Sequence, residues 1–230
     1  MTQEKTVNLT IVWRICALVL VIMFGMSLWA WFQLPADAAV PVHWNAAGTV
    51  DRYGGKIEGL LLLPLVTTGV VGLFSLIRYI DPLRANIQKS GQAYRATILG
   101  VVLFMALLHT IAILSALGYP LNMGSIIAPA LALLFIVLGN YMGKIRRNYM
   151  FGVRTPWTLA SDLAWNKTHR FTGRLFVIAG LLILLAGFWG PAWAFYTMMA
   201  TVLGSVVLAM LYSYFVWKHD PTVHPIEDAK

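Results

Sequence analysis

The chain has 230 residues, of which 59% are apolar and only 11% are charged. Soluble domains contain about 25% charged residues, so these values exclude a soluble globular protein and indicate an integral membrane protein. The formal charge of +8 relates to orientation in the bilayer, because Lys and Arg gather on the cytoplasmic side, and we expect no nucleic-acid partner. Cys16 is the single cysteine, which excludes an internal disulfide.

Stretches without Asp, Glu, Lys or Arg define the predicted helices. A membrane span needs about 20 apolar residues, and the charge-free stretches 15–36 and 59–77 each fit one helix. The longer stretches 96–143 and 175–217 each fit two helices with a turn at Gly and Pro residues between them. The sequence therefore predicts spans at residues 11–32, 58–79, 96–118, 123–143, 174–190 and 193–217.

The cations predict the orientation of these spans. Six spans place both termini on one side, and all of the 17 Lys and Arg residues then lie on that side except Arg52 and Lys56. Because cytoplasmic segments carry the excess of Lys and Arg, we predict that both termini are cytoplasmic.

A cleaved signal peptide is an alternative for the first span, because Ala36-Asp37-Ala38 resembles a small-residue cleavage site. The apolar run before it is longer than the roughly 7–15 residues of a signal peptide. Cleavage would also leave five spans and place the termini on opposite sides. We favour a helix that is retained.

The predicted outer loop, 33–57, contains the pattern P-x-H-x-N-x-x-G-x-x-D. Prolines interrupt a helix, and Asn45 and Gly48 are turn-forming residues, so we expect a structured loop. His43 and Asp51 either hydrogen-bond to one another or contribute to a metal site. The metal interpretation lacks a second strong ligand, so a structural or partner-binding role is favoured and no cofactor is expected.

The predicted inner loop, 144–173, is rich in cations. Thr155 has the character of a helix N-cap, and Pro156 suits the first helical position. Apolar residues at spacings of three and four up to Phe171 predict a mildly amphipathic helix at the membrane surface. The helix start beside Arg154 could bind an anion, but polybasic segments are also attracted to anionic lipids without specificity, and that interpretation is favoured.

Two polar residues fall within predicted spans. His109 lies near the middle of the third span, where an ionisable residue is a functional candidate by default. It could relay protons, or a neutral imidazole could hydrogen-bond to Thr67, Thr68 or Ser115 across helices. The predicted spans contain no carboxylate to accompany it, so the structural role is favoured. Asn140 could cap its helix or bridge to the inner loop.

Residues 139–176 follow the pattern GN-Y-x5-RN-Y-x-x-G-x-RTPWTL…W-x-x-TH-R-x-x-G. This stretch closely resembles the SdpI-type family of bacterial membrane proteins, and the outer-loop pattern resembles the domain of unknown function that often precedes it. Together the two resemblances cover roughly residues 10–217. The residues that match the longer pattern are Gly139, Asn140, Tyr141, Arg147, Asn148, Tyr149, Gly152, Arg154, Thr155, Pro156, Trp157, Thr158, Leu159, Trp165, Thr168, His169, Arg170 and Gly173.

The resemblance implies a multi-pass protein of the bacterial inner membrane with an immunity or signalling role. Such a protein protects its cell against a secreted antimicrobial toxin and holds a repressor at the membrane. It also implies an N-terminal two-helix unit, 1–95, followed by a four-helix unit, 96–230. The expected partners are an extracellular peptide toxin, a cytoplasmic regulator and membrane lipids.

We therefore predict an all-α membrane protein that acts by binding rather than by catalysis. The residues predicted for an outer site are His43, Asn45, Gly48 and Asp51, of which His43 and Asp51 are the metal candidates. Those predicted for an inner site are Asn140, Arg147, Asn148, Arg154, Thr155, Trp157, Thr168 and His169. The leading alternative is a membrane enzyme or transporter that acts on a lipid or small anion at the inner basic site, with His109 or His169 as the titrating group.

Overall fold

The computed structural model describes residues 8–223. Ten elements follow one another in this part of the chain, and eight of them are helices. In chain order they are α1 (Thr10–Gln33), β1 (Val40–Trp44), β2 (Val50–Gly54), α2 (Lys56–Ile80), α3 (Arg84–Lys89), α4 (Gly91–Ala116), α5 (Met123–Met142), α6 (Pro156–Ala160), α7 (Asp162–Gly187) and α8 (Pro191–Lys218).

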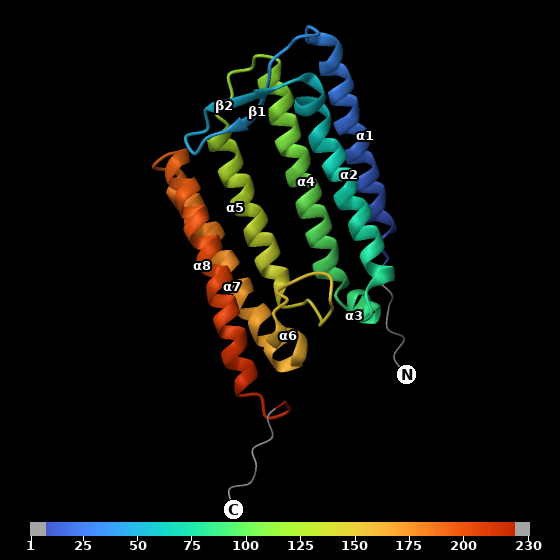
Figure 1. The fold of residues 1–230 in the computed structure, drawn as a ribbon, viewed down its shortest axis with the longest axis vertical. Coiled ribbons are helices and arrows are strands. Elements are labelled where there is room, and N and C mark those ends of the chain that lie inside the picture. Colours follow the sequence, from blue (N-terminus) through green and yellow to red (C-terminus); the bar gives the residue numbers. More distant parts are fainter. Residues whose placement is uncertain (1–7, 224–230) are drawn as a thin grey trace, which may run out of the picture.

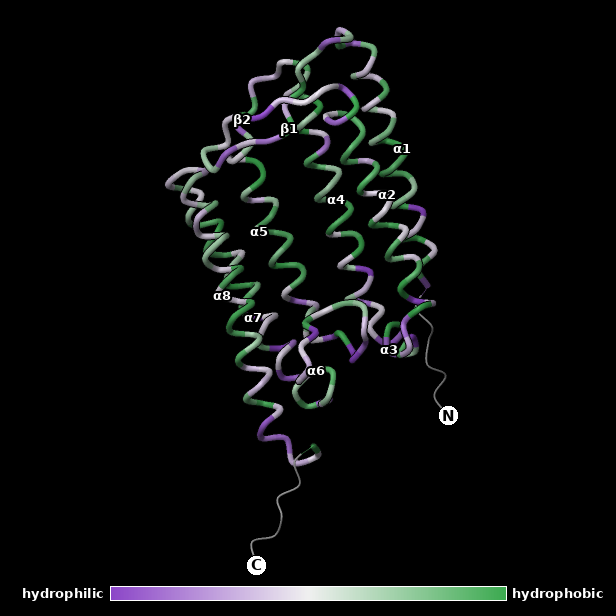
Figure 2. Tube along the Cα trace, in the orientation of Figure 1, coloured by the Kyte–Doolittle hydropathy of each residue, from purple (hydrophilic) through white to green (hydrophobic). Residues whose placement is uncertain are grey.

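Within residues 8–223, six helices are long and apolar enough to cross a membrane, namely α1, α2, α4, α5, α7 and α8. Figure 1 shows these helices running side by side, with the two strands at one end and the short helices α3 and α6 at the other. We name these the hairpin end and the loop end. Figure 2 shows apolar residues along the middle of the long helices and hydrophilic residues near both ends. The six predicted spans are confirmed, and the side that each end faces stays a prediction.

The fifth span differs most from its prediction, because α7 begins at Asp162 and not near residue 174. At 1.5 Å per residue its 26 residues extend about 39 Å, against about 30 Å for the hydrocarbon core. Its first turns can therefore project beyond the bilayer. In these turns Lys167, Arg170 and Arg174 are exposed, whereas Thr168 and His169 are buried.

The predicted inner loop is consequently shorter than 144–173, and the predicted surface helix does not exist as one element. Thr155 is the N-cap of α6 and forms a capping box with Thr158, as the sequence predicted for its start. After five residues the chain becomes extended at Ser161, and this residue caps α7. Of the positions assigned to one surface helix, Trp157 and Ala160 lie in α6, whereas Ala164, Thr168 and Phe171 lie in α7, where Ala164 and Thr168 are buried.

Strands β1 and β2 form an antiparallel hairpin, an element that the sequence pattern did not predict within the structured outer loop. The hairpin is held against the helices by close packing of Val40 on Gly59 of α2, where an added Cβ would lie 2.2 Å from Val40 Cγ1. The Lys56 ammonium donates hydrogen bonds to the carbonyls of Trp31 and Leu34, at 2.5 and 2.9 Å. It thus satisfies carbonyls at the end of α1 that have no helical partner.

Helices α5 and α7 approach one another through small residues. An added Cβ at Gly173 would lie 2.6 Å from the carbonyl oxygen of Gly139, and one at Gly180 would lie 2.6 Å from that of Ala132. The two positions are seven apart in each helix, so each pair lies on one face. Small residues at such positions let membrane helices pack backbone to backbone, and this contact joins α5 to the α7–α8 pair.

Candidate functional site

Asn45 and Gly48 build the turn of the hairpin. The side-chain Oδ1 of Asn45 accepts hydrogen bonds from the backbone N–H groups of Ala47 and Thr49, at 2.9 and 3.2 Å. Gly48 has φ of +80°, a left-handed conformation that glycine adopts without strain. These two residues of the predicted outer site therefore position the loop.

His43 and Asp51 face one another across the two strands on the exposed surface of the hairpin. The His43 Nδ1 and Asp51 Oδ1 atoms are 2.6 Å apart, and the two side chains are 61% and 42% exposed. This is the hydrogen bond that the sequence suggested as one of two possibilities. Within residues 8–223 no group of three or more His, Cys, Asp and Glu side chains is arranged to hold a metal ion, so the pair gains no third ligand of these types.

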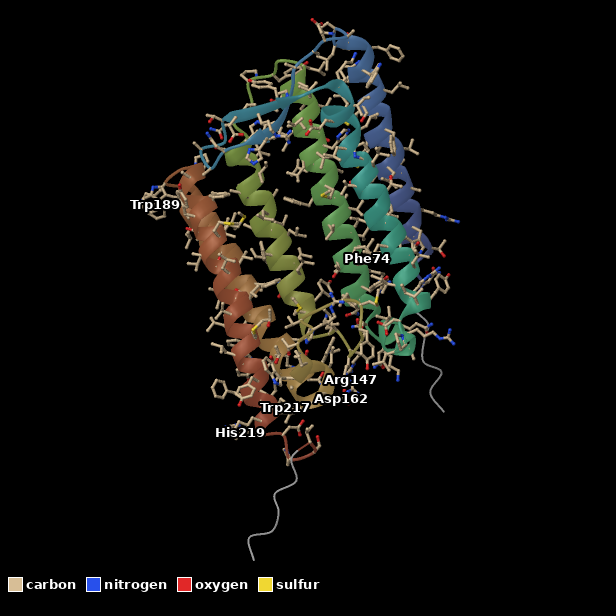
Figure 3. All side chains as sticks on the ribbon, viewed as in Figure 1. Phe74, Arg147, Asp162, Trp189, Trp217 and His219 are labelled. Carbon is tan, nitrogen blue, oxygen red and sulfur yellow. The ribbon has the colours of Figure 1, made fainter. Side chains whose placement is uncertain are left out.

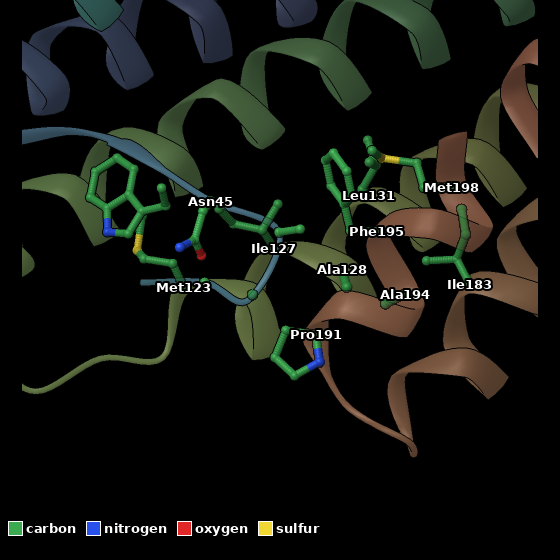
Figure 4. A pocket seen from close by; sticks show the side chains of 14 residues that line it. Asn45, Met123, Ile127, Ala128, Leu131, Ile183, Pro191, Ala194, Phe195 and Met198 are labelled. Atoms are coloured by element: carbon green, nitrogen blue, oxygen red, sulfur yellow. The ribbon is translucent and has the colours of Figure 1, made fainter. Parts of the chain in front are cut away.

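An apolar pocket of about 250 Å³ lies beneath the hairpin turn. Figure 4 shows Asn45 on one side of it and Ile127 of α5, Pro191 and Phe195 of α8 around it. The turn is seated tightly here, because an added Cβ at Gly48 would lie 2.7 Å from the backbone nitrogen of Gly124. The predicted outer site is therefore joined to the C-terminal helices, and its lower surface is apolar.

At the loop end, Asn148 organises the chain between α5 and α6. It is fully buried, and its Oδ1 accepts hydrogen bonds from the N–H groups of Met150 and Phe151, at 2.9 and 2.7 Å. Its Nδ2 donates to the carbonyl of Arg146 at 2.9 Å. A buried amide that satisfies three backbone groups fixes the shape of a segment without regular structure, so Asn148 has a structural role.

His169 holds the same segment to α7. Its Nδ1 lies 2.9 Å from the carbonyl of Trp165, and its Nε2 accepts from the N–H of Val153 at 3.0 Å. Because a backbone N–H only donates, Nε2 carries no proton and the imidazole is neutral with its proton on Nδ1. Both ring nitrogens are therefore engaged by backbone groups, which leaves neither available to a substrate in this conformation.

Close packing around this histidine depends on a glycine and a tryptophan. Gly152 has φ of +105°, and an added Cβ there would lie 2.5 Å from His169 Nε2. The indole of Trp165 stacks on the imidazole with ring centres 4.1 Å apart and donates through Nε1 to the carbonyl of Ile145 at 2.8 Å. Trp165 and His169 of the sequence pattern are thus buried against one another, and the exposed Gly152 packs directly on the imidazole.

The cations of the predicted inner site also bind within the protein. Arg147 forms an ion pair with Asp162, with 2.9 Å between Nε and Oδ1, and it donates to the carbonyl of Leu159 at 3.0 Å. Figure 3 shows the two charged side chains next to one another at the loop end. Arg154 donates to the carbonyl of Tyr149 at 2.7 Å. Both guanidinium groups are therefore engaged by other groups of the protein.

The remaining residues of the predicted inner site are dispersed. Asn140 is exposed and donates to the carbonyl of Ile136 in its own helix at 2.9 Å, so it does not bridge to the loop. The Trp157 ring contacts Tyr214 of α8 edge-on. Thr155 Oγ1 lies 3.0 Å from Ser213 Oγ, also in α8. Thr168 is buried, and its hydroxyl has no hydrogen-bond partner in the described part of the chain.

Sequence reasoning missed the residues that join this loop to the N-terminal helices. Asp81, which directly follows α2, is buried and accepts from the N–H of Tyr149 at 2.9 Å. Asn86 donates to the carbonyl of Arg147 at 2.8 Å, and Ser90 Oγ accepts from the N–H of Arg146 at 2.8 Å. One signal was present, because a single aspartate between basic residues at the end of a span indicates a specific acceptor.

His109 bridges three helices, as the structural interpretation expected, but through different partners. Its Nε2 lies 3.1 Å from both Ser27 Oγ and the carbonyl of Met23 in α1, and Ser27 Oγ donates to the carbonyl of Leu60 in α2 at 2.6 Å. Thr67 and Thr68, which the sequence suggested as partners, donate instead to carbonyls of their own helix, Leu63 and Pro64. The Nδ1 atom is buried without a hydrogen-bond partner among the described residues.

Comparison with known proteins gives two matches to family models and one to a characterised protein. Residues 144–216 match the SdpI/YfhL protein family, and residues 18–68 match a domain of unknown function, DUF1648. Over 208 residues the chain is 26% identical to the immunity protein SdpI of Bacillus subtilis (strain 168), which covers 89% of this chain and 95% of that protein. No solved structure matches the chain. The resemblance seen in the sequence is confirmed.

Proposed function

We propose that this multi-pass membrane protein, similar over most of its length to an SdpI immunity protein, protects the cell that makes it against a secreted peptide toxin. The observation that carries the proposal is the extent of the match, which includes both the hairpin and the loop network. The contacts of Asn148, Gly152 and His169 support it further, because these residues of the shared pattern all hold the inner loop in place.

The toxin, on this proposal, is met at the hairpin end, which the distribution of Lys and Arg assigns to the outside. Two features of different chemistry lie there. The His43–Asp51 pair is exposed on the upper surface of the hairpin, and the apolar pocket lies under its turn, lined in part by Asn45 and Gly48. An amphipathic peptide at the membrane surface could place polar groups on the first and an apolar side chain in the second.

The loop end, on the same proposal, is a platform for a cytoplasmic regulator. Its buried residues would then hold the platform in one shape. Arg146, Arg154 and Arg170 are exposed on it, so an acidic surface of a partner is the complementary chemistry. A binding role agrees with the engagement of both nitrogens of His169 by backbone groups.

The test is survival of a host strain from which the gene has been deleted, challenged with the host's own culture supernatant and with a panel of secreted membrane-active peptides. We expect the deletion strain to be killed at lower doses than the parent, and we expect the complementing gene to restore resistance. A variant with His43→Ala and Asp51→Ala should insert normally but restore less resistance. Equal survival of the parent and deletion strains against every challenge would contradict the proposal.

A further inference from the structure

A second cavity, of about 540 Å³, lies at the loop end where α1 begins, α2 ends and α4 begins. No residue of the predicted sites lines it, and it belongs to the N-terminal helices. Arg78 and Arg84 contribute guanidinium groups to its lining, together with Gln88 and the aromatic rings of Tyr79 and Tyr94. Apolar side chains complete the wall. The lining therefore joins two positive charges to an apolar surface and contains no carboxylate.

Arg78 is half-buried and has no neutralising partner among the residues that the structure describes. Its guanidinium carbon lies 4.5 Å from the ring centre of Tyr79 and 5.8 Å from that of Trp13, and it also hydrogen-bonds to the Tyr79 hydroxyl. No ion pair to Arg78 occurs among residues 8–223. Its Nε and the Trp13 Nε1 are buried donors without an acceptor in that part of the chain.

The nearest acidic residue along the chain does not compensate for this charge. Asp81 is buried, and its two oxygens accept from the backbone N–H groups of Leu83 and Tyr149, at 2.6 and 2.9 Å. Arg84, the first residue of α3, is exposed and likewise forms no ion pair within the described residues. A partly buried cation without a counter-charge is unfavourable. Arg78 is such a cation, and the exposed Arg84 adds a second positive charge to the same lining, so the cavity suits an anionic ligand.

We propose that this cavity binds a phosphate group, with Arg78 and Arg84 as its ligands. The planar guanidinium fork matches the oxygens of a phosphate and can donate two parallel hydrogen bonds to it. The cavity lies at the loop-end limit of α1 and α2, where Trp13 marks the depth of lipid headgroups. A phospholipid headgroup is therefore the expected source of the phosphate, with its acyl chain along the apolar wall. The inference does not depend on the immunity role.

The experiment uses the full-length protein, delipidated in a neutral detergent, and native mass spectrometry to count retained lipids. Phosphatidylglycerol is compared with phosphatidylcholine, and inorganic phosphate is added as a competitor. The test variant carries Arg78→Gln and Arg84→Gln. The matched control carries Lys167→Gln and Arg174→Gln, which remove the same charge from exposed positions at the same end. A third variant with Arg84→Gln alone guards against misfolding, because that side chain is exposed and makes no hydrogen bond or ion pair within residues 8–223.

We expect the wild type to retain one phosphatidylglycerol in preference to phosphatidylcholine, and the test variant to bind it about tenfold more weakly or worse. The control should bind as the wild type does, and Arg84→Gln should show an intermediate loss. Displacement of the lipid by inorganic phosphate would assign the site to phosphate in general, whereas resistance to displacement would assign it to the lipid. Equal losses of phosphatidylglycerol binding in the test variant and the control would overturn the proposal. So would a wild type that neither prefers phosphatidylglycerol to phosphatidylcholine nor binds inorganic phosphate.

Discussion

His169 Nε2 accepts a hydrogen bond of 3.0 Å from the backbone N–H of Val153, and this contact ties the inner loop to the start of α7. His169→Phe keeps a ring of similar size but leaves the Val153 N–H without an acceptor, which costs about 1–3 kcal/mol for a buried donor. We expect a lower melting temperature of the purified protein in detergent and reduced toxin resistance. His219→Phe is the control, because that histidine is exposed at the end of α8. Equal melting temperatures for the two variants would refute the structural role.

In the hairpin, different polar residues are expected to serve folding and toxin binding. Asn45 contacts the backbone of the turn, whereas His43 and Asp51 contact one another on the exposed surface. Asn45→Ala removes the acceptor of two turn N–H groups, so we expect a less stable hairpin, measured by protease cleavage between β1 and β2. His43→Ala and Asp51→Ala remove an exposed His–Asp hydrogen bond, and an exposed polar contact of this kind contributes about 0–1 kcal/mol. These variants should resist protease as the wild type does while conferring less resistance to the toxin. Full resistance to the toxin in the variant with both alanines would show that His43 and Asp51 are not part of the toxin-binding surface.

Asp81 accepts from the N–H of Tyr149 across a long separation in sequence, and it connects the N-terminal helices to the inner loop. Asp81→Leu leaves that donor and the Leu83 N–H unpaired, so the loop should open more often. We expect faster amide hydrogen exchange over residues 144–153 in the variant. Asp37→Leu changes an exposed aspartate at the other end and serves as the control. Identical exchange in this segment for both variants would show that the contact does not hold the loop.

The close α5–α7 contact predicts that a glycine-to-alanine substitution lowers stability at Gly180, whereas the same substitution at Gly69, outside this contact, does not. Gly180→Ala would place a Cβ 2.6 Å from the Ala132 carbonyl oxygen, so the helices must separate, and overpacking costs about 1–3 kcal/mol. Gly69 in α2 has open space around it, so Gly69→Ala should leave stability unchanged or raise it slightly. The measurement is the melting temperature of each variant in the same detergent. A Gly180→Ala protein as stable as wild type would show that the close approach is not required.

The spans could be predicted from sequence because a bilayer requires long charge-free segments, and the four long charge-free stretches divide at Gly and Pro residues into six helices. The start of α7 could not, because Lys167, Arg170 and Arg174 interrupt the apolar run. In the structure these cations occupy one exposed side, while Thr168 and His169 face inward. A polar helix that projects beyond the membrane looks like a loop when only the charge-free run is counted.

The sequence was sufficient to select the candidate residues, but not to decide whether each has a structural or a ligand-binding role. The patterns identified Asn148, His169 and Asn45. Asn148 and Asn45 proved to satisfy backbone groups of their own loops, and His169 of α7 proved to accept from a backbone N–H of the inner loop. Their hydrogen-bond partners are backbone groups, and other contacts of the same loop join residues far apart in the sequence, such as Asp81 and Tyr149. Sequence patterns contain no record of which carbonyl or N–H group a side chain will reach, so structural and ligand-binding roles look alike.

The sidedness of the two ends is the claim on which the proposed function depends most directly. Cys16 is the single cysteine and is buried, so Cys16→Ala provides a background for single-cysteine variants. Tyr53→Cys marks the hairpin and Arg146→Cys marks the inner loop, and both positions are exposed. With a membrane-impermeant maleimide applied to intact cells, we expect labelling at position 53 alone, and labelling at both positions after permeabilisation. Labelling of position 146 but not of position 53 in intact cells would contradict the account.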